Sequence, residues 1–436
     1  MKETPRIWQY RRALPGMEEE TSLNLLTTWE QSFSLLDVDM EHGGKLGDVL
    51  TLFAFFHPVG IREGLFRDIG SRKFTTSPMA IFEEDGEWSH DRFEQAVICM
   101  QEHSLIRFSR QSGDEIVVTL HSMVSEWLRL RLEKGVLSTT LDMAASHLVI
   151  YFESAELDYP KSQEVLLHMD SICRMATDVN AESCYAFGRF YAEYGRLEDA
   201  EIMFNRALTE YEKASAPGHP STLDAVFGLG VLYAHQGRYA DAEEMFKRAL
   251  AGQEEALGPE DISTLVTVSS LGGLYVIQGR FADAEEMYQR ALAGQEKALG
   301  PAHISTLYTV SGLGELNAHQ GRYADAEEMY KRPLAGQEKA LGPEDISTLV
   351  TVSSLGGLYV IQGRFADAEE MYQRALAGQE EALGPMHIAT LRTISGLGHL
   401  YARQERFADA EQMYQRALAG FEKSLGPEHT STPRDC

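Results

Sequence analysis

The sequence predicts an all-α fold, in which a superhelix of six helical hairpins follows a small domain of helices and one short β-hairpin. Two observations carry this prediction. One motif recurs every 42 residues in the C-terminal half: Gly-Arg, then an aromatic residue or Leu, then one variable residue, then Asp-Ala-Glu. The N-terminal part lacks this period and has separate apolar segments with helical spacing. Because a fixed period of roughly 20–50 residues signals stacked supersecondary units, the C-terminal half is expected to be a repeat superhelix.

The Gly-Arg pair marks the place where the first helix of each hairpin must end and turn. A Gly-Pro pair such as Gly300-Pro301 ends the second helix, because neither residue continues a helix well. The spacing predicts six hairpins over residues 181–430. Their first helices end at Gly195, Gly237, Gly279, Gly321, Gly363 and Glu405, which replaces the last glycine.

Small and large residues alternate as two packed antiparallel helices require. In the copy before Gly279, Gly272 and Tyr275 form Leu-Gly-x2-Tyr, and Ala284 and Tyr288 begin Ala-x3-Tyr-x2-Ala. The small residues allow the helices to approach, and the tyrosines fill the space between hairpins. This pattern resembles the tetratricopeptide repeat, and the resemblance implies a right-handed superhelix.

The repeats are longer than the common tetratricopeptide unit of about 34 residues, and the extra length falls in the second helix. Together with the run Arg-Ala-Leu-Ala-Gly-x-Glu-x-x-Leu-Gly-Pro, this length resembles the repeats of kinesin light chains over residues 181–430. Ser269-Ser270 stands where cargo-binding repeats of that family carry an Asn pair. A cargo adaptor of this kind is the alternative function, although residues 1–180 show no sustained heptad pattern for the coiled coil it requires.

One copy differs from its neighbours. Residues 259–296 and 343–380 are identical, whereas the copy between them has Asn317 in place of Tyr and Pro333 in place of Ala. A proline inside a helix removes a backbone hydrogen bond and costs about 3 kcal/mol. We therefore expect a kink or a local weakness at Pro333.

The segment before the repeats is predicted to form a winged-helix-like domain over residues 21–137. Gln111-Ser112-Gly113-Asp114 is a hairpin turn sequence between two short runs with strand propensity. The predicted strands are 106–110 and 115–120, and the predicted helices are 22–36, 46–56, 92–105 and 121–133.

Residues 22–56 and the run His121-Ser-Met-Val-Ser-Glu-Trp127 resemble the winged-helix region that follows the ATPase core in fungal STAND-type (NB-ARC) proteins. The resemblance implies that His121 is the relic of a nucleotide contact. No Gly-x4-Gly-Lys-Ser/Thr phosphate loop occurs, and Gly43-Gly44-Lys45-Leu46 lacks its first glycine and its hydroxyl. We expect that the chain starts after the ATPase core and binds no cofactor.

The remaining segments are expected to serve the ends of the superhelix. Residues 138–180 are predicted to form two helices, 141–154 and 163–177, that cap its first hairpin. Residues 1–20 and 431–436 are expected to be tails. No polar capping helix follows the last hairpin, so it is expected to fray or to associate with another copy through that end.

Composition limits the partners. The net charge of −27 repels nucleic acids and anionic membrane surfaces and favours a basic protein or peptide. The four cysteines form no CxxC pair, and residues 1–20 lack the apolar segment of a signal peptide. These features favour a cytoplasmic protein.

The sequence contains no recognisable catalytic or metal-binding constellation. Histidines recur in the inter-repeat loops, but whole repeats separate them, so each is expected to hydrogen-bond the start of a helix rather than a metal. Gly-x-Ser-x-Gly and His-Glu-x-x-His are absent. The sequence therefore predicts a protein that is not an enzyme. The loop histidines are His219, His303, His387 and His429.

The predicted function is protein or peptide binding in a concave groove lined by the first helices. Positions on these helices vary between copies while the scaffold residues stay constant, which favours a binding surface. The resemblances imply a partner-sensing arm like that of STAND proteins. The candidate groove residues are Asp224, Phe227, Val231, His235, Val266, Ser269, Tyr308, Ser311, Glu315, His319, Arg392, Ser395, His399 and Arg403.

Overall fold

The computed structural model describes residues 19–36, 46–67, 77–85, 87–111, 113–155, 157, 159–175, 179–214 and 218–425. The chain divides into two compact units, Met1–Ser183 and Cys184–Cys436. His429, the Gly43–Lys45 segment and most of the two expected tails lie outside the described residues.

The first unit contains the predicted helices and the predicted β-hairpin, together with short elements that the sequence pattern did not predict. The additional elements are β1 (Ile61–Arg62), α3 (Gly64–Arg67), a 3-10 helix (Pro78–Phe82), β2 (Glu83–Glu84) and β3 (Glu87–Trp88). The predicted ones are α1 (Glu19–Leu36), α2 (Leu46–Phe53), α4 (His90–Glu102), β4 (Ile106–Arg110), β5 (Ile116–Leu120), α5 (Ser122–Leu130), α6 (Lys134–Ser154) and α7 (Tyr159–Met175).

Three of the described strands form an antiparallel sheet in the order β1-β5-β4, and β2 pairs with β3 in a separate two-stranded ribbon. Ile106 pairs with Leu120 and Arg110 with Ile116, so the hairpin has the register that its turn sequence suggests. Gly113 and Asp114 both have positive φ in that turn. Most side chains of β5 are buried, which places this strand at the centre of the sheet and explains its continuous apolar sequence.

Aromatic side chains fill the core of the first unit. Phe53 contacts Phe66 and Phe93 with ring centroids 5.4 and 6.4 Å apart. Trp127, which is fully buried on α5, meets the Phe33 ring edge-on at 5.8 Å. The apolar run around α2 is therefore a helix that is buried on nearly all sides.

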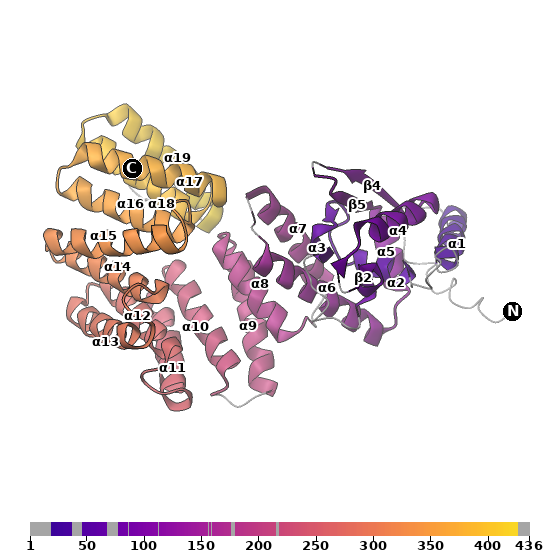
Figure 1. The fold of residues 1–436 in the computed structure, drawn as a ribbon, viewed down its shortest axis with the longest axis horizontal. Coiled ribbons are helices and arrows are strands. Elements are labelled where there is room, and N and C mark those ends of the chain that lie inside the picture. The colour runs from indigo at the N-terminus through magenta and orange to yellow at the C-terminus, as the bar shows by residue number, and fades with distance from the viewer. Residues whose placement is uncertain are drawn as a thin grey trace. The chain divides into compact units, whose positions relative to one another are not determined.

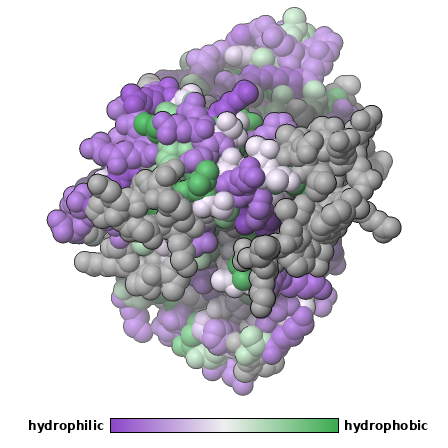
Figure 2. Space-filling view, turned by 90° about the vertical axis from the view of Figure 1, so that its right-hand side faces the viewer, coloured by the Kyte–Doolittle hydropathy of each residue, from purple (hydrophilic) through white to green (hydrophobic). Residues whose placement is uncertain are grey.

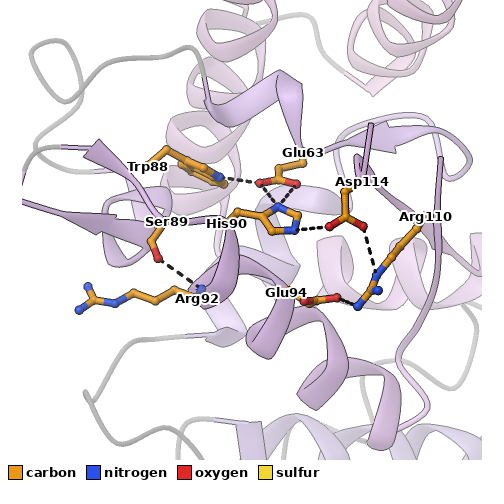
Figure 3. Close-up of polar contacts among 8 residues, drawn as sticks. All are labelled: Glu63, Trp88, Ser89, His90, Arg92, Glu94, Arg110 and Asp114. Carbon is orange, nitrogen blue, oxygen red and sulfur yellow. Dashed lines mark hydrogen bonds and ion pairs between the residues drawn. The ribbon is translucent and has the colours of Figure 1, made fainter. Parts of the chain in front are cut away.

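A buried carboxylate joins the start of α4 to the end of β1 (Figure 3). Glu63 is 1% exposed and accepts a hydrogen bond of 2.8 Å from the indole of Trp88. Its second partner is Nδ1 of His90, also at 2.8 Å. Hydrogen bonding to Glu63 raises the pKa of His90 above its ordinary value. A buried carboxylate needs such partners, so this cluster holds the small β2–β3 ribbon against the sheet.

The second unit consists of six helical hairpins, as predicted, and Figure 1 shows them stacked in chain order. Each second helix is long, which accounts for the 42-residue period. The hairpins are α8 (Ala181–Glu193) with α9 (Leu197–Ala214), α10 (Pro220–His235) with α11 (Tyr239–Ala256), α12 (Ile262–Ile277) with α13 (Phe281–Leu299), α14 (Ile304–His319) with α15 (Tyr323–Ala340), α16 (Ile346–Ile361) with α17 (Phe365–Ala382), and α18 (Ile388–Arg403) with α19 (Phe407–Leu425).

The first helices begin at side-chain caps. Asp261 accepts a hydrogen bond from the backbone N–H two residues later, and Asp345 does the same. His219, His303 and His387 use Nδ1 in the same way. The expectation that these loop histidines bind helix starts is confirmed for the three that the structure describes.

The packing between helices follows the predicted alternation of small and large residues. A Cβ atom at Gly272 would lie 3.2 Å from the ring of Tyr288, and one at Gly312 of the next hairpin would lie only 2.5 Å from its hydroxyl. Ala284 and Ala291 are fully buried. Tyr288 thus occupies space that only small neighbours leave open.

Basic and acidic side chains connect successive hairpins near the turn between the two helices of each hairpin. Arg280 Nη1 lies 2.9 Å from Glu243 Oε1, and its guanidinium lies 3.8 Å from the ring centre of Tyr275. In the fourth hairpin Asn317 replaces the tyrosine, and the Arg322–Glu285 pair opens to 3.7 Å. This hairpin is therefore held less tightly to its neighbour.

Candidate partner-binding face

The first helices line the inner side of the second unit. Successive first helices, such as α12 and α14 or α16 and α18, pack against each other more closely than successive second helices do. An array whose elements crowd on one side curves toward that side. We call the accessible side chains of α10, α12, α14, α16 and α18 the inner face.

The inner face is one stripe along each first helix. In α12 the residues that remain accessible include Val266, Ser269, Gly273 and Ile277, which recur every three to four positions. The intervening side chains are buried against the second helices and the neighbouring hairpins. The same stripe recurs in the other first helices, so each hairpin contributes a similar set of positions.

All the predicted groove residues lie on this stripe, and none of them is classed as buried. The exposed ones are Asp224, His235, Tyr308, Glu315, His319, Arg392, His399 and Arg403, and the half-buried ones are Phe227, Val231, Val266, Ser269, Ser311 and Ser395.

The middle of the inner face is apolar. Ile277, Tyr308, Val350 and Ile361 are between 44% and 54% exposed. Ile277 and Ile361 occupy the same helix position as His235 and His319, and Val350 occupies that of Tyr308, so the repeat pattern already places all three on this stripe as its apolar floor. Large apolar side chains that face solvent together mark a contact surface.

The last hairpin presents arginines without carboxylate partners. The arginines on the opposite side form inter-hairpin ion pairs, for example Arg290 with Glu254 at 2.6 Å and Arg332 with Glu296 at 2.7 Å. Arg392 and Arg403 have no such partner among the residues that the structure describes. An exposed guanidinium presents a planar set of donors that matches a carboxylate.

The first two hairpins present acidic groups instead. Burial raises the pKa of Glu193 and of Asp224, while the guanidinium of Arg189 acts in the opposite direction. Both side chains are accessible to solvent, so the burial reflects surrounding protein rather than complete enclosure. The inner face thus changes from acidic through apolar to basic along the array.

Two buried tyrosines and an aromatic pair lie close to the apolar middle of the inner face. Burial raises the pKa of Tyr288 and of Tyr330, and the nearby carboxylate of Glu315 adds to this rise. Both phenols therefore stay protonated. The ring of His319 stacks on Phe281 with centroids 6.0 Å apart. These contacts fix the surroundings of the apolar centre.

Figure 2 shows one face of the molecule, on which the described residues are mainly hydrophilic and the apolar ones form small separate patches. His121, the predicted relic of a nucleotide contact, is the N-cap of α5, and its Nδ1 accepts a hydrogen bond from Met123 N at 3.2 Å. Its position is explained by helix capping alone.

The described residues contain no group of His, Cys, Asp or Glu side chains placed to hold a metal ion. Among the described helices, none has the length and apolar character needed to cross a membrane.

Comparisons with solved structures find similar folds, whereas no curated protein matches the sequence. The repeats of a Podosopora anserina kinesin light chain are 26% identical, with a TM-score of 0.37, and the match covers 47% of this chain and 97% of that one. A STAND protein with a tetratricopeptide repeat sensor from Pyrococcus horikoshii gives 14% identity, a TM-score of 0.49 and coverage of 96% and 59%. A Rap protein complexed with Competence and Sporulation Factor gives 14% identity, a TM-score of 0.50 and coverage of 76% and 94%.

A family model gives the most specific match. The model described as tetratricopeptide repeat matches residues 181–255, 262–339, 303–381 and 347–423, which together make up more than half of the chain. These matches coincide with the helical hairpins of the second unit. The chain therefore belongs to the tetratricopeptide-repeat family.

Proposed function

We propose that the second unit binds a linear segment of a partner protein on its inner face and that the protein acts by binding rather than by catalysis. The observation that carries this proposal is the variation of the inner face on a nearly constant scaffold. Exposed apolar side chains on α12, α14 and α16 lie beside unpaired arginines on α18. A surface of this composition suits an extended or helical segment better than a small polar ligand.

The chemistry of the face indicates what the segment carries. Apolar side chains would cover Ile277, Tyr308 and Ile361, and a carboxylate would meet Arg392 or Arg403. The net charge of −27 favours a basic partner overall, and Asp224 on α10 suits a basic group. The segment therefore has an apolar centre and both signs of charge.

The biological role that we propose is a sensor arm of the STAND type. What supports it is the order that the sequence predicts, with a winged-helix-like domain over residues 21–137, a helical cap over 138–180 and repeats over 181–430. The sequence has no phosphate loop, so the arm works without nucleotide hydrolysis of its own.

A kinesin-light-chain-like cargo adaptor is the second candidate, and its support is the 42-residue repeat with its long second helix. An adaptor that pairs with a motor would need a coiled coil. Self-association through the last hairpin is a separate question, which sedimentation of the full chain at several concentrations answers.

The binding proposal is tested by selecting linear peptides from a displayed random library on the full chain. We expect selected peptides to contain an apolar core with Asp or Glu on one side. Replacing Arg392 and Arg403 together with Glu should weaken their binding about tenfold or more, equivalent to ~1.4 kcal/mol. Replacing Lys247 and Lys331 with Glu is the control, because both lysines lie on second helices. Equal binding by both double variants would place the site elsewhere.

A further inference from the structure

The two ends of the repeat array touch each other. Nε2 of His387, at the start of α18, makes a hydrogen bond with the backbone carbonyl of Glu193, at the end of α8. These residues are 194 positions apart, and they belong to the sixth and the first hairpin. The array therefore curves far enough to bring its last hairpin back to its first one.

His387 has two roles that fix its protonation. Its Nδ1 accepts a hydrogen bond from Ala389 N at 3.1 Å, so Nε2 must carry the proton that reaches the carbonyl of Glu193. Burial lowers its pKa below the ordinary value, and the nearby positive charge of Arg392 acts in the same direction. The neutral ring thus serves both as the helix cap and as the contact between the ends.

The two hairpins that meet carry opposite charges near the contact. Glu193 and Asp224 are exposed acidic residues of the first two hairpins, and Arg392, whose charge acts on His387, is an exposed basic residue of the sixth. Arg189 on α8 is the like-charged group that opposes the approach. Because these side chains lie at the surface, their net attraction depends on ionic strength.

A weak seam lies between the fourth and fifth hairpins. At three other junctions a buried glutamine accepts a hydrogen bond from a threonine of the next hairpin: Gln253 from Thr267 at 2.6 Å, Gln295 from Thr309 at 2.7 Å and Gln379 from Thr393 at 2.7 Å. The side chain of Gln337 is fully buried and has no partner within the described residues. A buried amide without partners is costly, so this junction is less stable than its neighbours.

The fourth hairpin has further signs of looseness. Pro333 lies one turn before Gln337 in α15. At the other junction of this hairpin, with the third one, Asn317 replaces the tyrosine that elsewhere lies under the inter-hairpin arginine, and the Arg322–Glu285 pair is wider than its counterparts. α14 packs on α16 less closely than α12 does on α14, and about as closely as α10 does on α12. At the seam itself, Pro333 and the unpartnered Gln337 coincide.

We propose that the repeat array is a clasp, closed by the contact of His387 with Glu193 and opened by movement at the seam after α15, and that this movement controls access to the inner face. The inference rests on the proposed function, because it assigns a regulation to the same surface. Closure itself needs no partner. It can therefore be measured on the full chain alone.

The test is hydrogen–deuterium exchange of two matched variants, His387→Asp and His303→Asp. Asp261 and Asp345 already cap the equivalent helices, so aspartate preserves the cap in both variants. Only His387→Asp removes the contact with Glu193 and places a carboxylate there instead. We expect its peptides around 190–197 and 334–351 to exchange at least about threefold faster than in the wild type, while His303→Asp leaves both segments unchanged.

The proposal is wrong if the two variants behave alike, or if His387→Asp alters exchange only within the first turn of α18. Either result would leave His387 as a helix cap and nothing more. Failure of this test is distinct from failure of the binding proposal. An array that stays rigid can still bind selected peptides on its inner face, and an array that opens can bind none.

Discussion

Glu405 has a left-handed backbone conformation at a turn position that is glycine in each of the other five hairpins. The turn between the two helices of each hairpin has φ values of 74–77° at Gly195, Gly237, Gly279, Gly321 and Gly363, and Glu405 has φ 61° at the sixth turn. A residue with a Cβ atom is disfavoured in this left-handed region. The last hairpin therefore contains a strained turn that the others avoid.

We predict that Glu405→Gly stabilises the last hairpin by about 1 kcal/mol, because glycine removes the strain at positive φ. The reciprocal variant Gly363→Glu should destabilise its hairpin by a similar amount. Urea denaturation followed by circular dichroism measures both changes. A Glu405→Gly chain no more stable than the wild type would show that the turn is not strained.

Two buried histidines of the first unit are held in the neutral form. Burial lowers the pKa of His147 to about 4 and that of His168 to about 3. His168 Nδ1 accepts a hydrogen bond from His57 N at 3.0 Å, and its Nε2 contacts the carbonyl of Gly60 at 3.2 Å. A second proton on the ring would remove one of these bonds.

The first unit should therefore lose stability in mild acid. Both pKa values are lower in the folded state than the ordinary 6.5, so the stabilisation is complete above pH 7 and declines as the pH falls below 6.5 toward the folded values. The expected loss between pH 7 and pH 5 is about 2 kcal/mol for each ring. His90 opposes this trend, because its raised pKa stabilises the fold on protonation.

Imidazole NMR signals over the same pH range measure these protonation states directly. We expect the signals of His147 and His168 to show no titration between pH 7.5 and 5, while urea midpoints of the first unit decrease. Titration of either ring near pH 6.5 in the folded chain would contradict the account.

At the residue scale, the sequence predicts what depends on neighbours in the chain. The turn glycines and the histidine caps were predictable because a left-handed turn and an N-cap involve residues only a few positions apart. The hydrogen bond between His387 and Glu193 was not, because it depends on the accumulated curvature of the whole array.

At the scale of elements, α15 shows the effect of one unfavourable residue in a repeated helix. The helix remains continuous from Tyr323 to Ala340 through Pro333, so the predicted kink is not a break. The weakness lies in the unpartnered side chain of Gln337. Tertiary packing on both sides thus maintains a helix that the local sequence disfavours.

We predict that Pro333→Ala stabilises the fourth hairpin by up to about 3 kcal/mol, because alanine restores the backbone donor and removes the ring clash. Ala375→Pro, in the equivalent position of the next copy, is the reciprocal variant and should weaken α17. Hydrogen exchange of peptides from α15 and α17 locates each change. Unchanged exchange in α15 of Pro333→Ala would mean that the proline is fully accommodated.

Other elements show where pattern reading fails. The β4–β5 hairpin was predicted within one residue at either end, since two runs of about five residues with strand propensity flank a distinctive turn sequence. β1 and the β2–β3 ribbon have two residues per strand, too few for any period to appear. They exist because the core of the first unit and the buried Glu63 cluster hold them in place.

Across the whole molecule, the second helices of the repeats stabilise the array, and the first helices provide the proposed binding surface. The ion pairs that join second helices hold successive hairpins together and satisfy much of the acidic charge. The first helices are left free to vary on the inner face, and the fourteen predicted residues all lie there. The sequence could indicate this face because variation on a fixed repeat is visible without a structure. The apolar floor from the Val and Ile positions could be expected in the same way, and the structure adds how far each of these side chains is exposed.

The most direct test of the central claim is the affinity of a selected peptide for two double variants of the full chain. Tyr308→Ala with His399→Ala removes inner-face side chains, and Tyr323→Ala with Lys331→Ala removes exposed side chains of α15. The account predicts that the first pair weakens binding about tenfold or more, while the second leaves it unchanged. Equal affinity for both variants, or loss only with the α15 pair, would show that the inner face is not the binding surface.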